Sequence, residues 1–468
     1  MFIQPKGAQI EVLALKPIGH TVVLGTAGSG KTTLALLLAE QRSNLAGRPN
    51  VLVVTYNRAL VAYMNGIAAQ KRGITVENYH KFAAGYLNSI NKMGFRGQTV
   101  ILSNNSRKEK LISDAVMVLQ QEYSQESTLH RPIRDFVEEI QFMQEFGTCS
   151  LEDYEKVGRI GRASTKIRRE NRKWFYMVYE MYLHKRAELG YLYDWDDIAI
   201  AVYNGLLEDN RERRYTHIIV DEGQDFSPMM LKSLVKAMAE DGSFVFFGDV
   251  AQQIYGNSLS WIASGIKIHK TWKFENNYRN PEEIALFAQD ITTHPNWETK
   301  GDEYVVPKFE VPAAGVKPVL VEYSSNDKEL KGLVSLLKGR TGRNVIIVKN
   351  RELVTLFYNA LKSQKINAAI IRKDDNNSIS DGIYVTTFHS AKGLEFDNVY
   401  LPCLNNDDFP DAERLESAES KEEEYAKVLK LFYVAATRAK QGLVMTFSRS
   451  LTSLFPVDSK NYIKHRGE

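Results

Sequence analysis

The stretch VVLGTAGSGKTTLALLLAE, which begins at Val22, constrains the fold of this chain more than any other segment. A β-branched apolar run leads into glycines, then into a Lys-Thr-Thr triplet, and then into apolar residues at helical spacing. The pattern G-x-x-x-x-G-K-[ST] of a phosphate-binding loop is met by Gly25, Gly30, Lys31 and Thr32. The segment therefore predicts an α/β domain that binds a nucleotide.

The chemistry expected of this loop is a cradle for phosphates. Glycines let the backbone curl so that successive N–H groups point at an anion, and the following helix presents its positive N-terminus to the same phosphates. Lys31 is expected to reach the β- and γ-phosphates of ATP, and the Thr32 hydroxyl to ligate Mg²⁺. The predicted cradle comprises Gly25, Thr26, Ala27, Gly28, Ser29, Gly30, Lys31, Thr32 and Thr33. Kinases, GTPases, transport motors and helicases all use such a loop, so other segments must identify the function.

Composition and charge are those of an ordinary globular protein with room for several domains. The chain has 468 residues, 44% of them hydrophobic and 25% charged. Its net charge of +3 is mild, so any surface for nucleic acid must be local. The only cysteines are Cys149 and Cys403, which argues against a disulfide framework or zinc cluster and suits a reducing compartment. With no apolar signal region or membrane-length apolar run, we expect a cytoplasmic protein without a membrane partner.

Apolar runs divide the chain into two α/β parts and one helical part. HTVVLG and NVLVVTYN have the character of buried parallel strands, and strands resume at YTHIIVDEGQD and SFVFFGD. From about Leu87 to Gly190 amphipathic helical patterns dominate instead. A second strand series contains KPVLVEYSS, RNVIIVKN, IYVTTFHS, NVYLPCL and GLVMTFS. The order predicts a parallel sheet interrupted by a helical insertion and then a second α/β domain.

Two acids, Asp221 and Glu222, stand at the carboxyl end of the apolar strand in HIIVDEGQD. Ligands of open α/β sheets bind at that edge. Asp221 is expected to hold Mg²⁺, and Glu222 to orient the attacking water or take its proton, because phosphoryl transfer needs mainly positioning and charge neutralisation. Together with the loop, these acids predict an enzyme that hydrolyses a nucleoside triphosphate.

Segments over nearly the whole chain resemble, in order, the motifs of UvrD/Rep/PcrA-type superfamily 1 DNA helicases. GTAGSGKTT resembles motif I, VLVVTYNRALVAYM motif Ia, ENYHKF the T-F-H-S-F block, and YDWDDIA the D-F-D-D-L segment. IIVDEGQDFSP resembles motif II, FFGDVAQQIYG motif III (G-D-x-x-Q-x-I-Y) and FENNYRN motif IV (L-x-x-N-Y-R-S). VTTFHSAKGLEFDNVYL resembles motif V and LFYVAATRAKQGL motif VI. HSAKGLEF and YVAATRA are the most specific of these matches.

The resemblance implies roles for further residues of an ATP site. Gln9 stands where the family has a glutamine that reads adenine, which suits an amide that both donates and accepts; an ordinary surface glutamine is the alternative. Gln252 corresponds to the motif III glutamine that senses the γ-phosphate and couples it to DNA. Tyr278 corresponds to a ring that stacks on adenine, with a core aromatic as the alternative, and Glu395 to a ribose contact.

Two arginines and two domains complete the implied motor. Arg279 and Arg438 would reach the γ-phosphate from the second domain as always-charged, bidentate groups, although either alone could be a surface ion pair. The implied fold is α/β, with two RecA-like P-loop domains on parallel sheets and a helical insertion in the first. We expect the first domain at 1–86 and 191–272, the insertion at 87–190, and the second domain at 273–468. ATP bound between the domains would close them, and hydrolysis would let them part.

Contacts to a single strand of DNA are also implied. The residues concerned are Thr55, Arg58, His80, Thr387 and His389, each of which has a cap or core role as its alternative. After motif III this chain has GNSLSWIASG where the family has an aromatic residue followed by R-G-A. Trp261 therefore either replaces the lost stacking ring or belongs to the core.

The leading hypothesis is an ATP- and Mg²⁺-dependent translocase or helicase on single-stranded DNA, with 3′→5′ polarity by resemblance. About 110 residues separate motif IV from motif V, so we expect the family's large helical insertion in the second domain to be absent and the motor to be compact. The alternative is a DNA-sensing regulatory ATPase of a repair or phage-defence module that recruits a separate nuclease. A motor on RNA is a third hypothesis, because the sequence does not reveal contacts to a 2′-hydroxyl.

Overall fold

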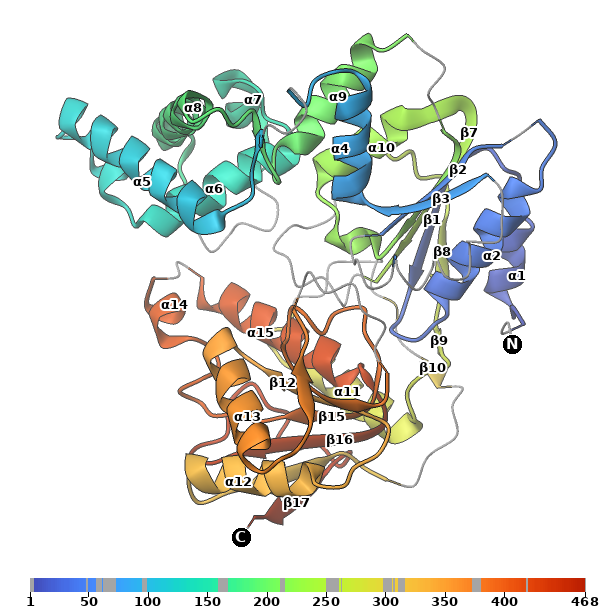
Figure 1. Cartoon of the computed structure of the whole chain (residues 1–468), viewed down its shortest axis with the longest axis vertical. Coiled ribbons are helices and arrows are strands. Elements are labelled where there is room, and N and C mark those ends of the chain that lie inside the picture. The colour runs from blue at the N-terminus through green and yellow to red at the C-terminus, as the bar shows by residue number, and fades with distance from the viewer. Residues whose placement is uncertain are drawn as a thin grey trace.

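The computed structural model contains two α/β domains, one above the other in Figure 1, and a group of helices beside the first. It describes residues 4–47, 49–55, 61, 73–94, 99–158, 167–210, 215–249, 261, 263–297, 305, 308–309, 316–372, 380–417 and 420–467. Within these ranges, no helix is both long and apolar enough to cross a membrane.

The first domain is built on a parallel sheet whose strand order is β3-β2-β6-β7-β1-β8. Its strands are β1 (Gly19–Gly25), β2 (Val51–Thr55), β3 (Ile74–Asn78), β6 (Tyr215–Asp221), β7 (Met238–Gly248) and β8 (Thr271–Phe274). Its helices are α1 (Ala8–Leu13), α2 (Lys31–Ser43), α4 (Tyr79–Ser89), α9 (Ile198–Glu208) and α10 (Pro228–Ala237). Because all strands run the same way, the loop after β1 and the acids at the end of β6 share one edge of the sheet.

Helices cover both faces of this sheet, which explains why its strands are continuous apolar runs. Successive strand residues point to opposite faces. Leu24 and Val220 pack with residues of α4, α9 and α10, whereas Val23 and Ile219 pack with residues of α1 and α2. The strands are therefore fixed from two sides, and their carboxyl ends are where ligands of such sheets bind.

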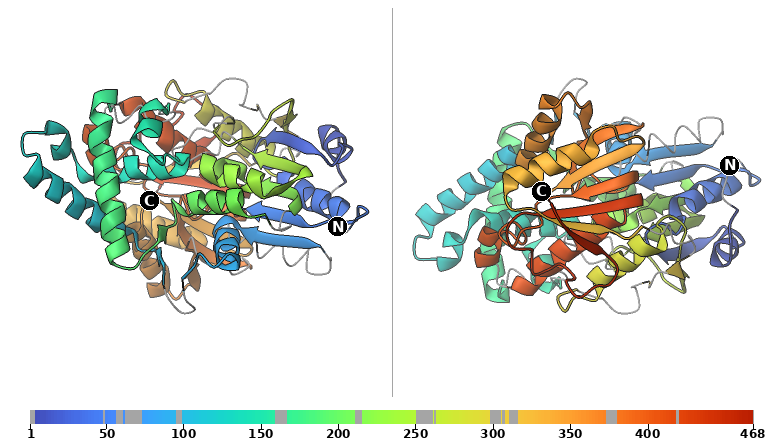
Figure 2. Two further views of the ribbon diagram at one scale, coloured as in Figure 1. Left: turned by 90° about the horizontal axis from the view of Figure 1, so that it is seen from above. Right: turned by 90° about the horizontal axis from the view of Figure 1, so that it is seen from below.

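The predicted helical insertion is present as a separate group of helices with its own apolar core. It contains α5 (Asn105–Glu122), α6 (Ile133–Phe146), α7 (Leu151–Lys156) and α8 (Arg172–Glu188), with short 3₁₀ turns η1 (Ser127–His130) and η2 (Arg169–Asn171). At its base β4 (Ile101–Leu102) pairs in parallel with β5 (Tyr193–Asp194). Both views in Figure 2 show these helices at the end of the molecule away from the N-terminus.

A buried polar network lies at the base of the insertion, just before the chain returns to the first domain at α9. Asp194 accepts hydrogen bonds from Tyr182 (2.6 Å) and Gln144 (2.9 Å) and lies 3.0 Å from Arg186 and 3.2 Å from Lys108. Burial alone would raise the pKa of Asp194, but the charges of Lys108 and Arg186 lower it well below its usual value. The YDWDDIA segment thus supplies the anionic centre of a joint between helices and sheet.

The second domain is also built on a parallel sheet, with the strand order β13-β14-β12-β15-β16-β11-β17. Its strands are β11 (Val319–Glu322), β12 (Arg343–Val348), β13 (Ala368–Ile370), β14 (Gly382–Thr387), β15 (Phe396–Leu401), β16 (Ala439–Phe447) and β17 (Ile463–Arg466). Its helices are α11 (Glu282–Thr292), α12 (Asn326–Leu337), α13 (Arg351–Ser363), α14 (Ala412–Ser417) and α15 (Lys421–Ala436). The α/β fold with two parallel-sheet domains, as predicted for two RecA-like domains, is confirmed.

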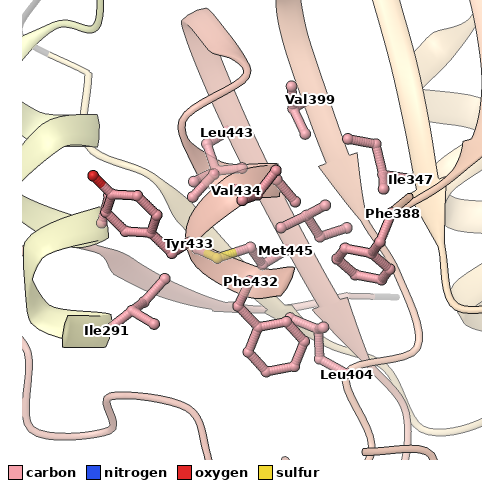
Figure 3. Packing of buried hydrophobic residues seen from close by; sticks show 14 of the residues in the cluster. Ile291, Ile347, Phe388, Val399, Leu404, Phe432, Tyr433, Val434, Leu443 and Met445 are labelled. Carbon is pink, nitrogen blue, oxygen red and sulfur yellow. The ribbon is translucent and has the colours of Figure 1, made fainter. Parts of the chain in front are cut away.

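The core of the second domain places α15 against its sheet. Phe432 and Val434 of α15 pack with Leu443 and Met445 of β16, and Ile291 of α11 joins the same cluster (Figure 3). On the other face, residues of α12 and α13 cover β12 and β14. Because Arg438 lies between α15 and β16, this packing determines where its backbone stands.

A short crossover joins the two domains. The first sheet continues through β8 to Phe274, two residues beyond the expected boundary, and β9 (Asn276–Asn277) then pairs with β10 (Lys308–Phe309). At the base of the insertion, β4 pairs with β5, whose residues Tyr193 and Asp194 follow the expected end of the insertion at 190. We therefore propose that the domain boundaries follow these sheets.

We predict that Arg186→Met lowers the free energy of unfolding by about 3–5 kcal/mol, because it leaves the buried carboxylates of Asp194 and Asp197 without their shared cation. Chemical denaturation measures this loss. The matched control is Arg168→Met, since Arg168 is largely exposed beside Glu170 and should contribute little. Equal stability of the two variants would show that the network does not hold the insertion.

Candidate functional site

The loop after β1 has the shape that the sequence predicts for a phosphate cradle. Gly28 and Gly30 have φ values of 72° and 79°, in the left-handed region that favours glycine. A Cβ on Gly28 would lie 2.5 Å from both Arg279 Cβ and Asn277 Oδ1. Glycine at this position therefore also allows the crossover segment with Asn277 and Arg279 to pack closely against the loop. The hydroxyls of Thr26 and Ser29 are buried and have no hydrogen-bond partner among the residues that the structure describes. Such orphaned donors suit an anion with several acceptor oxygens.

Lys31 begins α2 and points back into the loop. Its ammonium donates to the backbone oxygens of Gly25 (2.9 Å) and Thr26 (2.8 Å), and it lies 4.0 Å from the Asp249 carboxylate. The side chain is buried, with 7% of its surface exposed. A buried cation held by neutral carbonyls is a suitable partner for phosphate oxygens.

The metal-binding pair predicted from the sequence, Thr32 and Asp221, is in contact. The Thr32 hydroxyl donates to Asp221 Oδ2 at 2.7 Å, whereas Asp221 Oδ1 is buried and has no hydrogen-bond partner within the described part of the chain. Burial, and then the neighbouring Glu222 carboxylate, raise the pKa of Asp221 to about 7. An uncompensated carboxylate oxygen beside a hydroxyl fits Mg²⁺, which prefers hard oxygen ligands. The residues present therefore fit the ion that the sequence implies.

Glu222 is held in a defined orientation at the end of β6. Its backbone has φ 51°, a left-handed conformation that is uncommon for a residue with a Cβ. Gln224 donates to Glu222 Oε2 at 2.6 Å and accepts from the backbone N–H of Asp249 at 2.9 Å. Burial would raise the pKa of Glu222, but the charges of Lys31, Lys392 and Arg438 outweigh it and lower that pKa. The carboxylate is therefore ionised at neutral pH, as a base for water requires.

Arg438 approaches these acids from the second domain. Only 1% of its surface is exposed, and its guanidinium donates to the backbone oxygens of Val434 (3.0 Å) and Leu394 (3.4 Å). Burial and then the Arg279 charge lower its pKa to about 10, while Glu222, Glu395 and Asp249 act in the opposite direction. Arg438 thus stays protonated at neutral pH, close enough to Glu222 and Asp249 of the first domain for their charges to act on it.

Two comparisons of sequence now bear on the site. A family described as the UvrD/REP helicase N-terminal domain matches residues 7–268, more than half of the chain, and one described as the UvrD-like helicase C-terminal domain matches residues 368–450. The chain belongs to the UvrD/REP helicase family. This family assigns it to the ATP-hydrolysing enzymes of helicase type, and the matched segments contain the loop, the acids and Arg438.

The chain aligns with different fractions of the length of its relatives. A protein of Mycoplasma pneumoniae named a probable DNA helicase is 25% identical over 466 residues, covering 91% of this chain and 80% of that protein. A candidate ATP-dependent DNA helicase of Bacillus subtilis, YjcD, is 25% identical over 293 residues, or 59% of this chain. The chain spans only 35% of the length of YjcD.

The remaining ATP-site residues predicted for a UvrD-like helicase lie around the same loop. Gln9 is buried, donates to the backbone oxygen of Ser29 at 2.9 Å and accepts from the Lys6 N–H at 3.1 Å. Tyr278 is half-buried, and its N–H donates to the backbone oxygen of Gly28 at 3.0 Å. Gln9 is therefore no ordinary surface residue, and its contact with adenine stays a prediction.

Glu395 lies between two cationic side chains. It forms ion pairs with Arg279 and with Lys440, and although burial opposes this effect, these charges lower the pKa of Glu395 well below its usual value. Arg279 and Glu395, predicted for the γ-phosphate and the ribose, are thus in contact with each other. Gln252 lies outside the described residues.

Three residues of the helicase centre were missed from the sequence, although each stands inside a quoted motif. Gln224, described above, orients Glu222. Lys392 of the second domain forms an ion pair with Asp225, in the 3₁₀ turn η3 (Gly223–Asp225) of the first, and each of these two side chains is 6% exposed. A lysine in HSAKG and a third acid in DEGQD were the available signals for this ion pair.

The residues predicted to touch DNA have different surroundings. Thr55 is fully buried at the end of β2, paired in register with Asp221, so a contact to DNA would require this strand end to open. Thr387 caps the Ser390 N–H, whereas His389 is exposed. Arg58 lies outside the described residues.

Two aromatic contacts bear on the predicted strand-binding surface. His80 is half-buried and lies 4.7 Å from the ring of Trp195, measured between centroids. The Trp261 ring packs edge-on against Phe246 at 5.0 Å and against the first-domain core, which favours the core alternative.

We predict that Asp221→Asn stabilises the protein without nucleotide or Mg²⁺, and more so at pH 8 than at pH 5. A carboxyl whose pKa is raised from 3.8 to about 7 by folding favours the folded state at low pH, and this contribution is lost as the pH rises through that window. The amide removes the buried charge and should gain about 1–3 kcal/mol at pH 8. Thermal melts at both pH values test this.

The control for this substitution is Asp381→Asn, because Asp381 is exposed and should respond equally little at both pH values. An Asp221→Asn protein that is less stable than the parent at pH 8 would contradict the buried-charge account.

Proposed function

We propose that this protein hydrolyses ATP to move along single-stranded DNA in the 3′→5′ direction. The observation that carries the proposal is the pairing of opposite charges across the seam, by which we mean the contact between the two domains at these residues. Asp225 and Glu222 on the first domain face Lys392 and Arg438 on the second. A triphosphate on the loop after β1 would add negative charge on the first-domain side of this seam.

Each part of the hydrolysis then has a residue of this chain. Lys31 and the loop would bind the phosphates. Thr32 and Asp221 would hold Mg²⁺, which would supply positive charge to neutralise the phosphates. Glu222, oriented by Gln224, takes the proton of the attacking water. Arg438 stabilises the charge that develops on the γ-phosphate, an effect worth about 10³–10⁵ in rate for arginines of this kind.

Movement follows if both domains grip the same strand. Positive charge on the second domain is attracted to the triphosphate, and hydrolysis followed by release weakens that attraction, so closure depends on the nucleotide. Between Asn280 and Gly382, the described residues form α11, β11, α12, β12, α13 and β13 of the second domain, and β10 of the crossover. This compact second domain supports translocation rather than processive unwinding by the protein alone.

We predict that single-stranded DNA raises the ATPase rate many-fold and that Lys31→Ala abolishes turnover, because the buried ammonium is the phosphate ligand of the loop. The rate is measured at one fixed salt concentration with single-stranded DNA, duplex DNA and RNA, since phosphate contacts depend on ionic strength. Release of streptavidin from the 5′ end of an oligonucleotide reports direction.

The control for the lysine is Lys16→Ala, since Lys16 is exposed and precedes β1. Turnover that no nucleic acid changes would refute the motor. Stimulation by RNA but not by DNA would assign it to RNA.

A further inference from the structure

Asn280 is a buried amide with an unusual set of partners at the crossover between the domains. It is 1% exposed. Its Nδ2 donates to the backbone oxygens of Thr437 (3.1 Å) and Ala439 (2.6 Å), and its Oδ1 accepts from Asn277 Nδ2 at 3.0 Å. The two protons and the oxygen of one side chain are therefore all used.

The two carbonyls that Asn280 binds flank Arg438. They stand immediately before and after this residue, at the junction of α15 and β16. The Arg438 guanidinium is itself bound to Val434 and Leu394 of the second domain. Asn280 therefore holds the backbone from which this guanidinium extends.

The turn that contains Asn280 also contacts the loop after β1, the proposed phosphate-binding loop. Asn277 Oδ1 accepts from the backbone N–H groups of Arg279 (2.9 Å) and Asn280 (3.1 Å) and so closes the turn 277–280. Within that turn the Tyr278 N–H donates to the backbone oxygen of Gly28. The backbone of this turn and its hydrogen bonds thus connect Gly28 to the two residues that flank Arg438.

We propose that Asn280 is a positioning residue for Arg438, setting the distance between this arginine and the phosphate-binding loop. The proposal rests on the proposed role of Arg438 at the γ-phosphate. Motif IV as quoted above has serine at this place. A serine hydroxyl has one proton and a shorter reach, so it cannot donate to both carbonyls while accepting from Asn277.

The test compares Asn280→Ala with Asn344→Ala. Asn344 is an equally buried amide of the second domain that donates to two backbone oxygens, those of Thr341 and Gly342 (both 3.0 Å), and accepts from Asn398. It stands at the opposite, N-terminal end of β12. Both substitutions should lower the melting temperature by similar amounts.

Only Asn280→Ala should lower kcat, by about tenfold to a hundredfold, because small displacements of a catalytic group have effects of that size. The Kd for ADP should not change, since ADP lacks the γ-phosphate. Asn280→Ser should resemble Asn280→Ala. In an Arg438→Ala background, adding Asn280→Ala should leave the residual rate unchanged.

Equal kcat for Asn280→Ala and Asn344→Ala, at matched folded fraction, would overturn the proposal. So would a further loss of rate in the Arg438→Ala background. A parent protein with no ATPase activity would refute the proposed function instead, which keeps the two failures distinct.

Discussion

The attraction between opposite charges across the domain seam is the interaction on which the rest of this structure depends. The ion pair of Lys392 with Asp225 crosses the seam, and both side chains are almost fully buried. Removing one partner from such a pair leaves an uncompensated charge, which is far more costly than losing an exposed pair. Arg438 adds a second cation beside Glu222 and Asp249. The two domains therefore meet where their charges are complementary, and this is also where a triphosphate would lie.

In both domains, the parallel sheet brings charged residues from distant parts of the sequence to the same edge. In the first, the carboxyl ends of β1, β6 and β7 bring Lys31, Asp221 and Asp249 together, although they are far apart in the sequence. In the second, β14 leads to Lys392, whereas Arg438 precedes β16. The groups proposed for hydrolysis are divided between the two domains, and we therefore propose that the orientation of one domain relative to the other controls the chemistry.

The sequence was sufficient for the parts that depend on local pattern. Apolar runs and turn residues predicted both sheets and the insertion. The G-x-x-x-x-G-K-T spacing and the acids of DEGQD predicted Thr32 and Asp221 as ligands of Mg²⁺, and these two side chains are in contact. It was insufficient where partners are distant. Lys392 and Asp225 are 167 positions apart, and Asn280 binds backbone atoms, which no side-chain pattern encodes. Trp261 remained open from sequence because an aromatic residue suits both a stacking platform and the core beside Phe246.

The most direct test of the account is the distance between the domains. Double electron–electron resonance measures this distance between spin labels attached at Gln41→Cys on α2 and Gln364→Cys after α13. The two native cysteines, Cys149 and Cys403, are replaced by serine so that only these sites are labelled. We expect one narrow distance distribution for the parent protein. Lys392→Met should broaden this distribution and shift it to longer distances. Adding a non-hydrolysable ATP analogue with Mg²⁺ to the variant should narrow the distribution again. Lys464→Met, which removes an exposed ion pair within the second domain, should have no effect. A Lys392→Met distribution identical to that of the parent would contradict the claim that charge across the seam holds the domains together.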